Sequence, residues 1–254
     1  MSKLNTIQSR TPPNPDEILD QLARKHNEAR GVGMQVVQMV GGKAEGLLDR
    51  LPAPVRNQLD GATKSALEAA LRAAQTSRGV VSDQPAWMNT AVNTALGAAG
   101  GVGGLPSAMA ELPVTTTVLL RAIQGAAADY GFDPADPDIQ RDCLIVFSSA
   151  GPLEADDGTD TSFFAARMAL SGSTVQGIIA KVAPRLGAVL GQKLAAQAVP
   201  VLGAVAGAAV NYTFTSYYQT MAQVHFGLKR LALETGQDGA DLMGRLRLKI
   251  ETRS

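Results

Sequence analysis

The chain has 254 residues with 23 basic and 23 acidic side chains, so its formal net charge is zero and gives no indication of nucleic-acid binding. One Cys and two His residues exclude a disulfide framework and any cysteine-based zinc site, and they leave little room for another transition-metal site. Aromatic residues make up 4% of the chain whereas Gly contributes 26 residues, a composition that favours closely packed helices over a large aromatic-lined pocket.

The N-terminal segment, residues 1–15, is polar and proline-containing, and we expect it to be a disordered arm. It lacks the apolar stretch of a secretory signal, so we expect the protein to be cytoplasmic, either free or peripheral at the inner face of the membrane. Asp16 is suited to cap a helix that runs to about Arg30, where Gly31 and Gly33 would interrupt it.

Two further helices are predicted in the first third of the chain. One lies over residues 34–51 and is weakened by adjacent glycines, and the other lies over residues 55–78, after prolines that break the chain. Their mixed charge indicates solvated faces. We therefore expect residues 16–84 to form an N-terminal subdomain of amphipathic helices.

Two long runs, residues 84–110 and 194–228, carry no charged side chain apart from His225. Both are long enough to span a membrane, but they contain many Asn, Gln, Ser and Thr residues, so we do not expect constitutive transmembrane helices. Their glycines recur at four-residue spacing, which predicts helices that pack closely, in the pairs Gly97/Gly101 and Gly203/Gly207.

Pro106 is expected to open a helix after a Gly-rich break, Asp138 to cap a short helix, and Pro184 to follow the end of another. No segment shows the alternation typical of strands, so the predicted fold is all-α, a single-core bundle of about eight to ten helices. The later helices are predicted over residues 138–149, 161–183, 184–199 and 200–235, with a helical tail over residues 236–254.

Charge is distributed unevenly along the second half of the chain. Residues 129–160 hold nine acids against Arg141 alone, whereas residues 161–230 hold six bases and no acid. The acids could neutralise the bases within the fold, or the bases could face the headgroups of an anionic membrane.

Four short pieces of sequence, taken in order, resemble the bacterial EcsC protein family over roughly residues 85–235. The resemblance implies an EcsC-like helical domain but no settled activity; members of the family are sometimes labelled peptidases, and its namesake sits beside an ABC exporter of the same operon. The pieces are Glu111-Leu-Pro, Tyr130-Gly-Phe-Asp-Pro, the run from Pro200 to Asn211, and Ala222…Phe226…Lys229-Arg230-Leu.

Motifs for standard catalysis are missing. The sequence has no His-Glu-x-x-His, no Gly-x-Ser-x-Gly and no nucleotide-binding glycine loop, so we predict no metal and no cofactor. Cys143 and His225 could form a thiol dyad, although a buried inert thiol is the usual outcome for such a cysteine. The acids of residues 129–142 could bind a hard cation, but Asp-Pro steps more often form turns and caps.

Glu111 is the one acid among residues 84–128, and it precedes Pro113 in an otherwise apolar helix. A buried carboxylate there needs a partner, and Arg121 lies about 15 Å further along a straight helix. Glu111 could therefore form a structural ion pair or serve as a ligand-binding or catalytic carboxylate. The candidate partners are Lys181, Arg185 and Lys193.

The last long helix carries an apolar stripe and, beside it, a second stripe of Asn211, Thr215, Tyr218, Ala222, His225 and Lys229. The second stripe could line a polar groove or form the solvated side of the helix. Asn211 stands apart because it ends an Ala/Gly/Val run, where exposure to solvent is not expected.

These features predict a non-catalytic helical module that binds an anionic membrane surface or an apolar small ligand. Lys181, Arg185 and Lys193 would meet the headgroups, while helices around residues 91–105 and 195–210 would dock or partly insert. The alternatives are a hydrolase of unrecognised mechanism centred on Glu111 and a soluble adaptor that binds a protein partner. The candidate ligand-binding residues are Glu111, Arg121, Lys181, Arg185, Lys193, Asn211, Tyr218 and His225.

Overall fold

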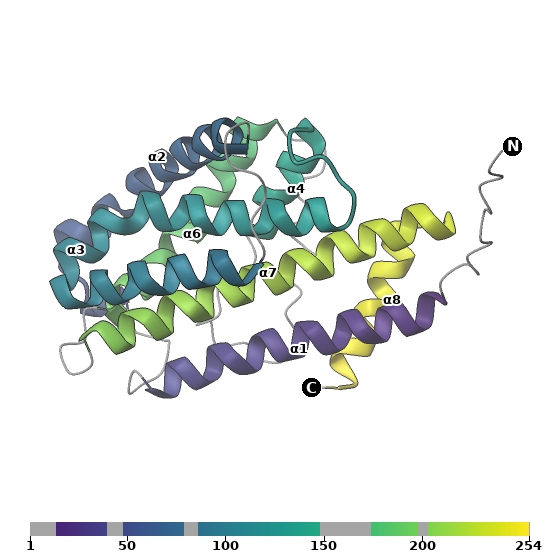
Figure 1. Cartoon of the computed structure of the whole chain (residues 1–254), viewed down its shortest axis with the longest axis horizontal. Coiled ribbons are helices and arrows are strands. Elements are labelled where there is room, and N and C mark those ends of the chain that lie inside the picture. The colour runs from purple at the N-terminus through teal and green to yellow at the C-terminus, as the bar shows by residue number, and fades with distance from the viewer. Residues whose placement is uncertain (1–13, 40–47, 79–85, 148–173, 198–202, 254) are drawn as a thin grey trace, which may run out of the picture.

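The computed structural model describes residues 14–39, 48–78, 86–147, 174–197 and 203–253 (Figure 1). These residues form α-helices and one short 3-10 helix and contain no strand, which confirms the predicted all-α fold. The elements are α1 (Pro15–Met39), η1 (Leu48–Arg50), α2 (Ala53–Arg78), α3 (Ala86–Asp129), α4 (Pro137–Phe147), α6 (Val175–Gln197), α7 (Gly203–Thr235) and α8 (Gly239–Glu251).

Helix α7 is the central element of the bundle. It lies between α1 and α3 in Figure 1, and it also contacts α4, α6 and α8. One continuous cluster of buried apolar side chains includes residues of every one of these helices and of α2. The N-terminal helices α1 and α2 therefore share a single core with the rest of the described chain.

Helix α3 doubles back on itself. Near its start the Thr90 hydroxyl donates to Gln219 Oε1 at 3.2 Å, and just past its end the Phe132 ring lies 5.7 Å from the Phe226 ring. A straight helix of 44 residues would be about 66 Å long, whereas seven residues of α7 span about 10 Å. Figure 1 accordingly shows two arms side by side along α7. We call residues 86–98 the first arm, antiparallel to α7, and residues 112–129 the second arm.

Two predicted helix boundaries are wrong, since α1 continues through Gly31 and Gly33 to Met39 and α6 continues through Pro184. At the predicted break before Pro106 the residues remain helical, but the direction of α3 reverses there. A glycine costs a helix only about 1 kcal/mol. The exposed Pro184 costs more, but buried Val182 and Leu186 flank it, so packing holds the two halves of α6 together. Tertiary packing thus outweighs these local signals.

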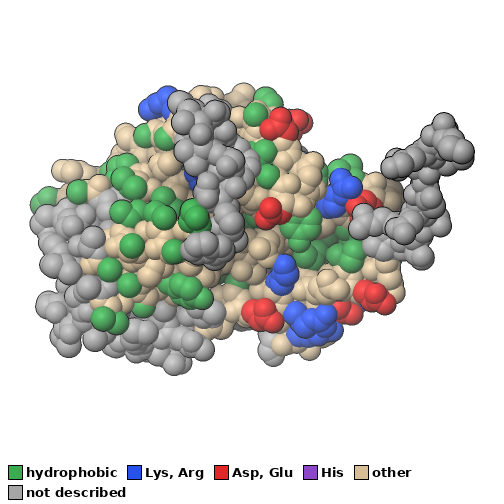
Figure 2. Space-filling model, viewed as in Figure 1, with side chains coloured by type: hydrophobic (Ala, Val, Ile, Leu, Met, Phe, Trp, Pro, Cys, Tyr) green, Lys and Arg blue, Asp and Glu red, His purple; other side chains and the backbone are tan. Residues whose placement is uncertain are grey.

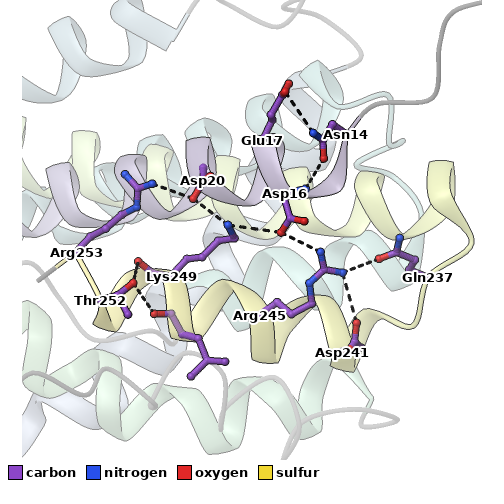
Figure 3. Close-up of polar contacts among 11 residues, drawn as sticks. Asn14, Asp16, Glu17, Asp20, Gln237, Asp241, Arg245, Lys249, Thr252 and Arg253 are labelled. Atoms are coloured by element: carbon purple, nitrogen blue, oxygen red, sulfur yellow. Dashed lines mark hydrogen bonds and ion pairs between the residues drawn. The ribbon is translucent and has the colours of Figure 1, made fainter.

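Several ion pairs join α8 and the residues that follow it to α1 (Figure 3). Arg245 Nη2 lies 3.1 Å from Asp16 Oδ1, while Lys249 Nζ and Arg253 Nη2 lie 3.0 and 2.9 Å from Asp20 Oδ1. Hydrogen bonds from Arg245 and Lys249 lower the pKa of Asp16 and Asp20 respectively, against a smaller opposing effect of burial. The charged side chains of α1 and α8 therefore neutralise one another at this end of the bundle.

Candidate functional site

A buried row of amide and hydroxyl groups joins the first arm to α7. Asn93 Nδ2 donates to Thr215 Oγ1 at 2.6 Å, Asn211 Nδ2 donates to the Asn93 carbonyl at 2.8 Å, and Thr215 Oγ1 donates to the Asn211 carbonyl at 2.8 Å. Asn93, Asn211 and Thr215 are all fully buried. Together with Thr90 and Gln219, which are hydrogen-bonded one turn further along, they form what we call the polar seam.

The two helices approach closely beside the polar seam because Gly97 has no side chain. A Cβ atom at Gly97 would clash with the carbonyl oxygen of Gly207 and would lie 2.7 Å from the Asn211 Cβ atom. Real Cβ atoms essentially never come so close to a neighbour. The close approach that the glycine spacing predicts is thus present at Gly97 and Gly207.

The first arm has its polar face inside and its apolar face outside. Among the side chains described in residues 88–98, only Asn93 and Gly97 are buried, whereas Ala91, Val92 and Ala95 are exposed, Val92 to 48%. An ordinary surface helix has the opposite arrangement. The start of α7 shares this feature in part, since Asn211 is buried while Val205 is 68% exposed.

Several of the exposed large apolar side chains lie at one end of the molecule. In Figure 2 hydrophobic side chains are scattered over the left part of the visible surface, where Figure 1 places α3 and the start of α7, while most of the visible acidic and basic side chains lie towards the other end. We call the first arm together with residues 203–212 of α7 the charge-free end. Its exposed large apolar side chains include Val92, Val205 and Tyr212.

The second stripe of α7 is neither a groove nor a solvated face. Asn211, Thr215, Tyr218, Ala222 and His225 are all fully buried. Helix α7 contacts α1, α3, α4, α6 and α8, so this side of it faces other helices and not solvent. The Tyr218 ring, for example, packs edge-on against Phe147 of α4, with the ring centroids 5.0 Å apart.

A second cluster of functional groups lies where α4 meets α7. Asp142 Oδ2 accepts a 2.5 Å hydrogen bond from Lys229 Nζ, and Asp142 Oδ1 lies 3.4 Å from His225 Nε2. The Lys229 ammonium also lies 5.5 Å from the centre of the Phe132 ring, which packs against Phe226. Two of the pieces that carry the family resemblance, around Tyr130 and around Phe226, therefore meet here.

Asp142 is ionised in this cluster. Burial by itself would raise the pKa of Asp142, but the hydrogen bonds and charges of His225 and Lys229 outweigh burial and hold that pKa well below its usual range. The cluster also pairs an acid of residues 129–160 with a base of residues 161–230. At this point the acidic segment does neutralise the basic one, as the first of the two interpretations of the charge pattern predicts.

The other acids of residues 129–142 shape the chain locally. Asp133 Oδ1 accepts from the Ala135 amide at 2.9 Å, and Asp136 Oδ1 accepts from the Asp138 amide at 2.7 Å. Since α4 begins at Pro137, Asp136 is its N-cap. The prediction that Asp138 caps this helix is wrong; Asp138 lies in the first turn and pairs with Arg141. Within the described ranges, no three His, Cys, Asp or Glu side chains are grouped to hold a metal ion.

The remaining predicted site residues are dispersed. Lys193 is fully buried in α6, where no headgroup reaches it without movement of the helices, whereas Lys181 of the same helix is exposed. Arg121 is half-buried in the second arm of α3. Glu111 and Arg185 belong to α3 and α6, but their side chains lie outside the described part of the chain. Cys143 is a fully buried thiol.

Sequence reasoning missed Asn93 and Asp142. Asn93 lies in a charge-free Ala/Gly helix, as Asn211 does, so the reasoning that singled out Asn211 would also have found it. Asp142 is one of nine acids in its segment. Only the contact between α4 and α7 distinguishes it from the others.

The fold and these two sites define an all-α bundle wrapped around one long central helix. The chain belongs to the EcsC protein family, whose model matches residues 82–231. That match covers α3 to α6 and nearly all of α7, and it leaves out α1, α2 and α8. No curated protein and no solved structure matches the chain.

None of the described helices is both long enough and apolar enough to cross a bilayer.

Proposed function

We propose that the chain is a non-catalytic module that binds peripherally to a membrane through its charge-free end. The observation that carries this proposal is that the first arm of α3 buries the polar Asn93 and exposes the apolar Val92. Transfer of exposed apolar surface from water to the acyl boundary releases about 25 cal/mol per Å². Val92, Val205 and Tyr212 supply such surface, and no charged residue occurs within either segment of the charge-free end.

Apolar contact rather than charge is expected to supply most of the binding free energy. Of the bases in residues 161–230, Lys193 is buried, Lys229 is paired with Asp142, and Arg230 is paired with Glu234 at 2.7 Å. Lys181 is exposed and can meet an anionic headgroup, a contribution of about 1 kcal/mol. Binding should therefore be only moderately stronger on anionic than on neutral vesicles.

Flotation with liposomes tests the proposal. The wild-type protein should float with neutral and with anionic vesicles, and raising the salt concentration should weaken binding only slightly. Replacing Val92 and Val205 together by Asp places two charges at the apolar boundary, so flotation should fall by at least about tenfold.

The matched control is Leu233→Asp with Leu248→Asp. These two leucines are as exposed as Val205, at 65% and 63%, but they lie on the C-terminal part of α7 and on α8. The control should float like the wild type. Equal losses in both double variants, or a wild-type protein that floats with neither kind of vesicle, would overturn the proposal and favour an adaptor that binds another protein.

A further inference from the structure

The described side chains of the first arm contribute little to the apolar core. None of the apolar side chains described in residues 88–98 belongs to the buried core or to the partly buried side chains packed against it. The second arm, by contrast, contributes Leu112, Leu119, Leu120 and Ile123 to that core. Since apolar burial is the main favourable contribution to packing, the described side chains of the first arm hold it more weakly than those of the second arm hold the second.

The polar seam that holds the first arm is also incompletely hydrogen-bonded. Asn93 Oδ1 is buried, and no group in the described part of the chain donates a hydrogen bond to it. A buried polar atom without a partner loses its hydration and gains nothing in return, which makes a partly satisfied network costly.

Both faces of the first arm would find a better environment at a membrane surface. In the bundle Asn93 on its polar face is buried, while Val92 on its apolar face meets water. In an interfacial helix the apolar face lies in the acyl boundary and the polar face meets water and headgroups. Residues 88–98 have the required pattern. Asn89, Asn93 and Gly97 recur at four-residue spacing along one side of the helix, and Met88, Val92 and Leu96 form an apolar stripe next to them.

We infer that the first arm of α3 separates from α7 when the protein binds a membrane and lies in the interface as an amphipathic helix. The arm turns about the Gly-rich segment before Pro106, where α3 already reverses its direction. The second arm stays in the core. This inference rests on the proposed function, because it describes how the charge-free end engages lipid.

A crosslink across the polar seam tests the release of the arm. Asn93 Nδ2 and Thr215 Oγ1 are 2.6 Å apart, so cysteines at both positions can be bridged by oxidation or by a short dithiol-specific reagent. The bridged protein keeps its exposed apolar surface but holds the arm on α7. We expect it to partition into vesicles about tenfold less than the same variant in its reduced form.

A pair of cysteines at the other end of the molecule is the matched control. Asp20 and Lys249 form a 3.0 Å ion pair between α1 and α8. Because the long lysine stem spans part of the distance between the helices, cysteines at these two positions are bridged by a longer dithiol-specific reagent, which joins α1 to α8 without restraining the arm. Bridged and reduced forms of this control should float equally. As a second measurement, a water-soluble maleimide should label Thr215→Cys faster in the presence of vesicles, because release of the arm uncovers position 215.

The outcomes separate this inference from the proposed function. Equal flotation of the bridged and reduced seam variants, with no change in labelling at position 215, would overturn arm release while membrane binding itself stands. A wild-type protein that does not float would overturn both. Reduced flotation of the bridged seam variant alone, with faster labelling in the presence of vesicles, is the expected result.

Discussion

Gly97→Ala is expected to loosen the first arm of α3 without disrupting the core. The added methyl group would overlap the Gly207 carbonyl and crowd Asn211, neither of which can move away without displacing the α7 backbone. Overpacking of this kind costs about 1–3 kcal/mol. Because the arm contributes no described apolar side chain to the core, we expect the protein to relieve the clash by opening the arm. Amide hydrogen exchange of residues 86–98 should then be about five to 150 times faster.

The control is Gly125→Ala, in the second arm of the same helix. A Cβ atom there meets nothing within 4 Å, so the substitution should stabilise the protein by about 0.5–1 kcal/mol through helix propensity. Denaturant unfolding measures both effects. If arm release accompanies binding, Gly97→Ala should also float more strongly than the wild type, and Gly125→Ala should not. A Gly97→Ala protein with wild-type hydrogen exchange in the arm would contradict the close contact at Gly207.

Much of the fold follows from the sequence, since helix α2 begins and ends within two residues of its predicted limits and α7 ends at the predicted Thr235. The errors share one cause. Gly31 and Pro184 each carry a local cost to a helix that does not end it, and at Pro184 a single sequence shows this cost without the buried neighbours that offset it. The reversal of α3 is not visible either, because glycines that permit a turn equally permit close packing of a straight helix.

The candidate sites show the same limit. Asn211 could be selected from its apolar surroundings, and the structure does bury it. Lys193 resembles any surface base in the sequence but is fully buried, since the orientation of α6 depends on contacts with α2, α3 and α4. Asp142 is 83 residues before His225 in the chain, and their proximity depends on how α4 packs against α7. Residue type thus indicated which groups needed partners, but not which partners they have.

Asp142→Asn is expected to destabilise the protein by about 1–3 kcal/mol at neutral pH, because it removes the anion that His225 and Lys229 face. Lys229 is partly exposed and retains some hydration, which keeps the loss below that of a fully buried pair. Asp138→Asn is the control in the same helix. The ion pair between Asp138 and Arg141 is largely exposed to solvent, so Asp138→Asn should change the free energy of unfolding by only about 0–1 kcal/mol.

The loss of unfolding free energy caused by Asp142→Asn should become smaller as the pH falls. The folded-state pKa of Asp142 lies well below that of an aspartate in the unfolded chain, so in acid the unfolded chain binds the proton more readily than the folded protein does. The stabilisation by Asp142 is complete above about pH 4 to 5 and is lost as the pH falls through the lowered folded-state pKa. Urea unfolding of wild type and variant should therefore give free energies that approach one another as the pH falls from about 5 towards 2, because the unfolded wild-type chain takes up a proton at Asp142 over this range while the folded protein does not. A difference that stays constant over this range would mean that the variant acts through packing, and that the ionised carboxylate between α4 and α7 contributes nothing to the stability of the bundle.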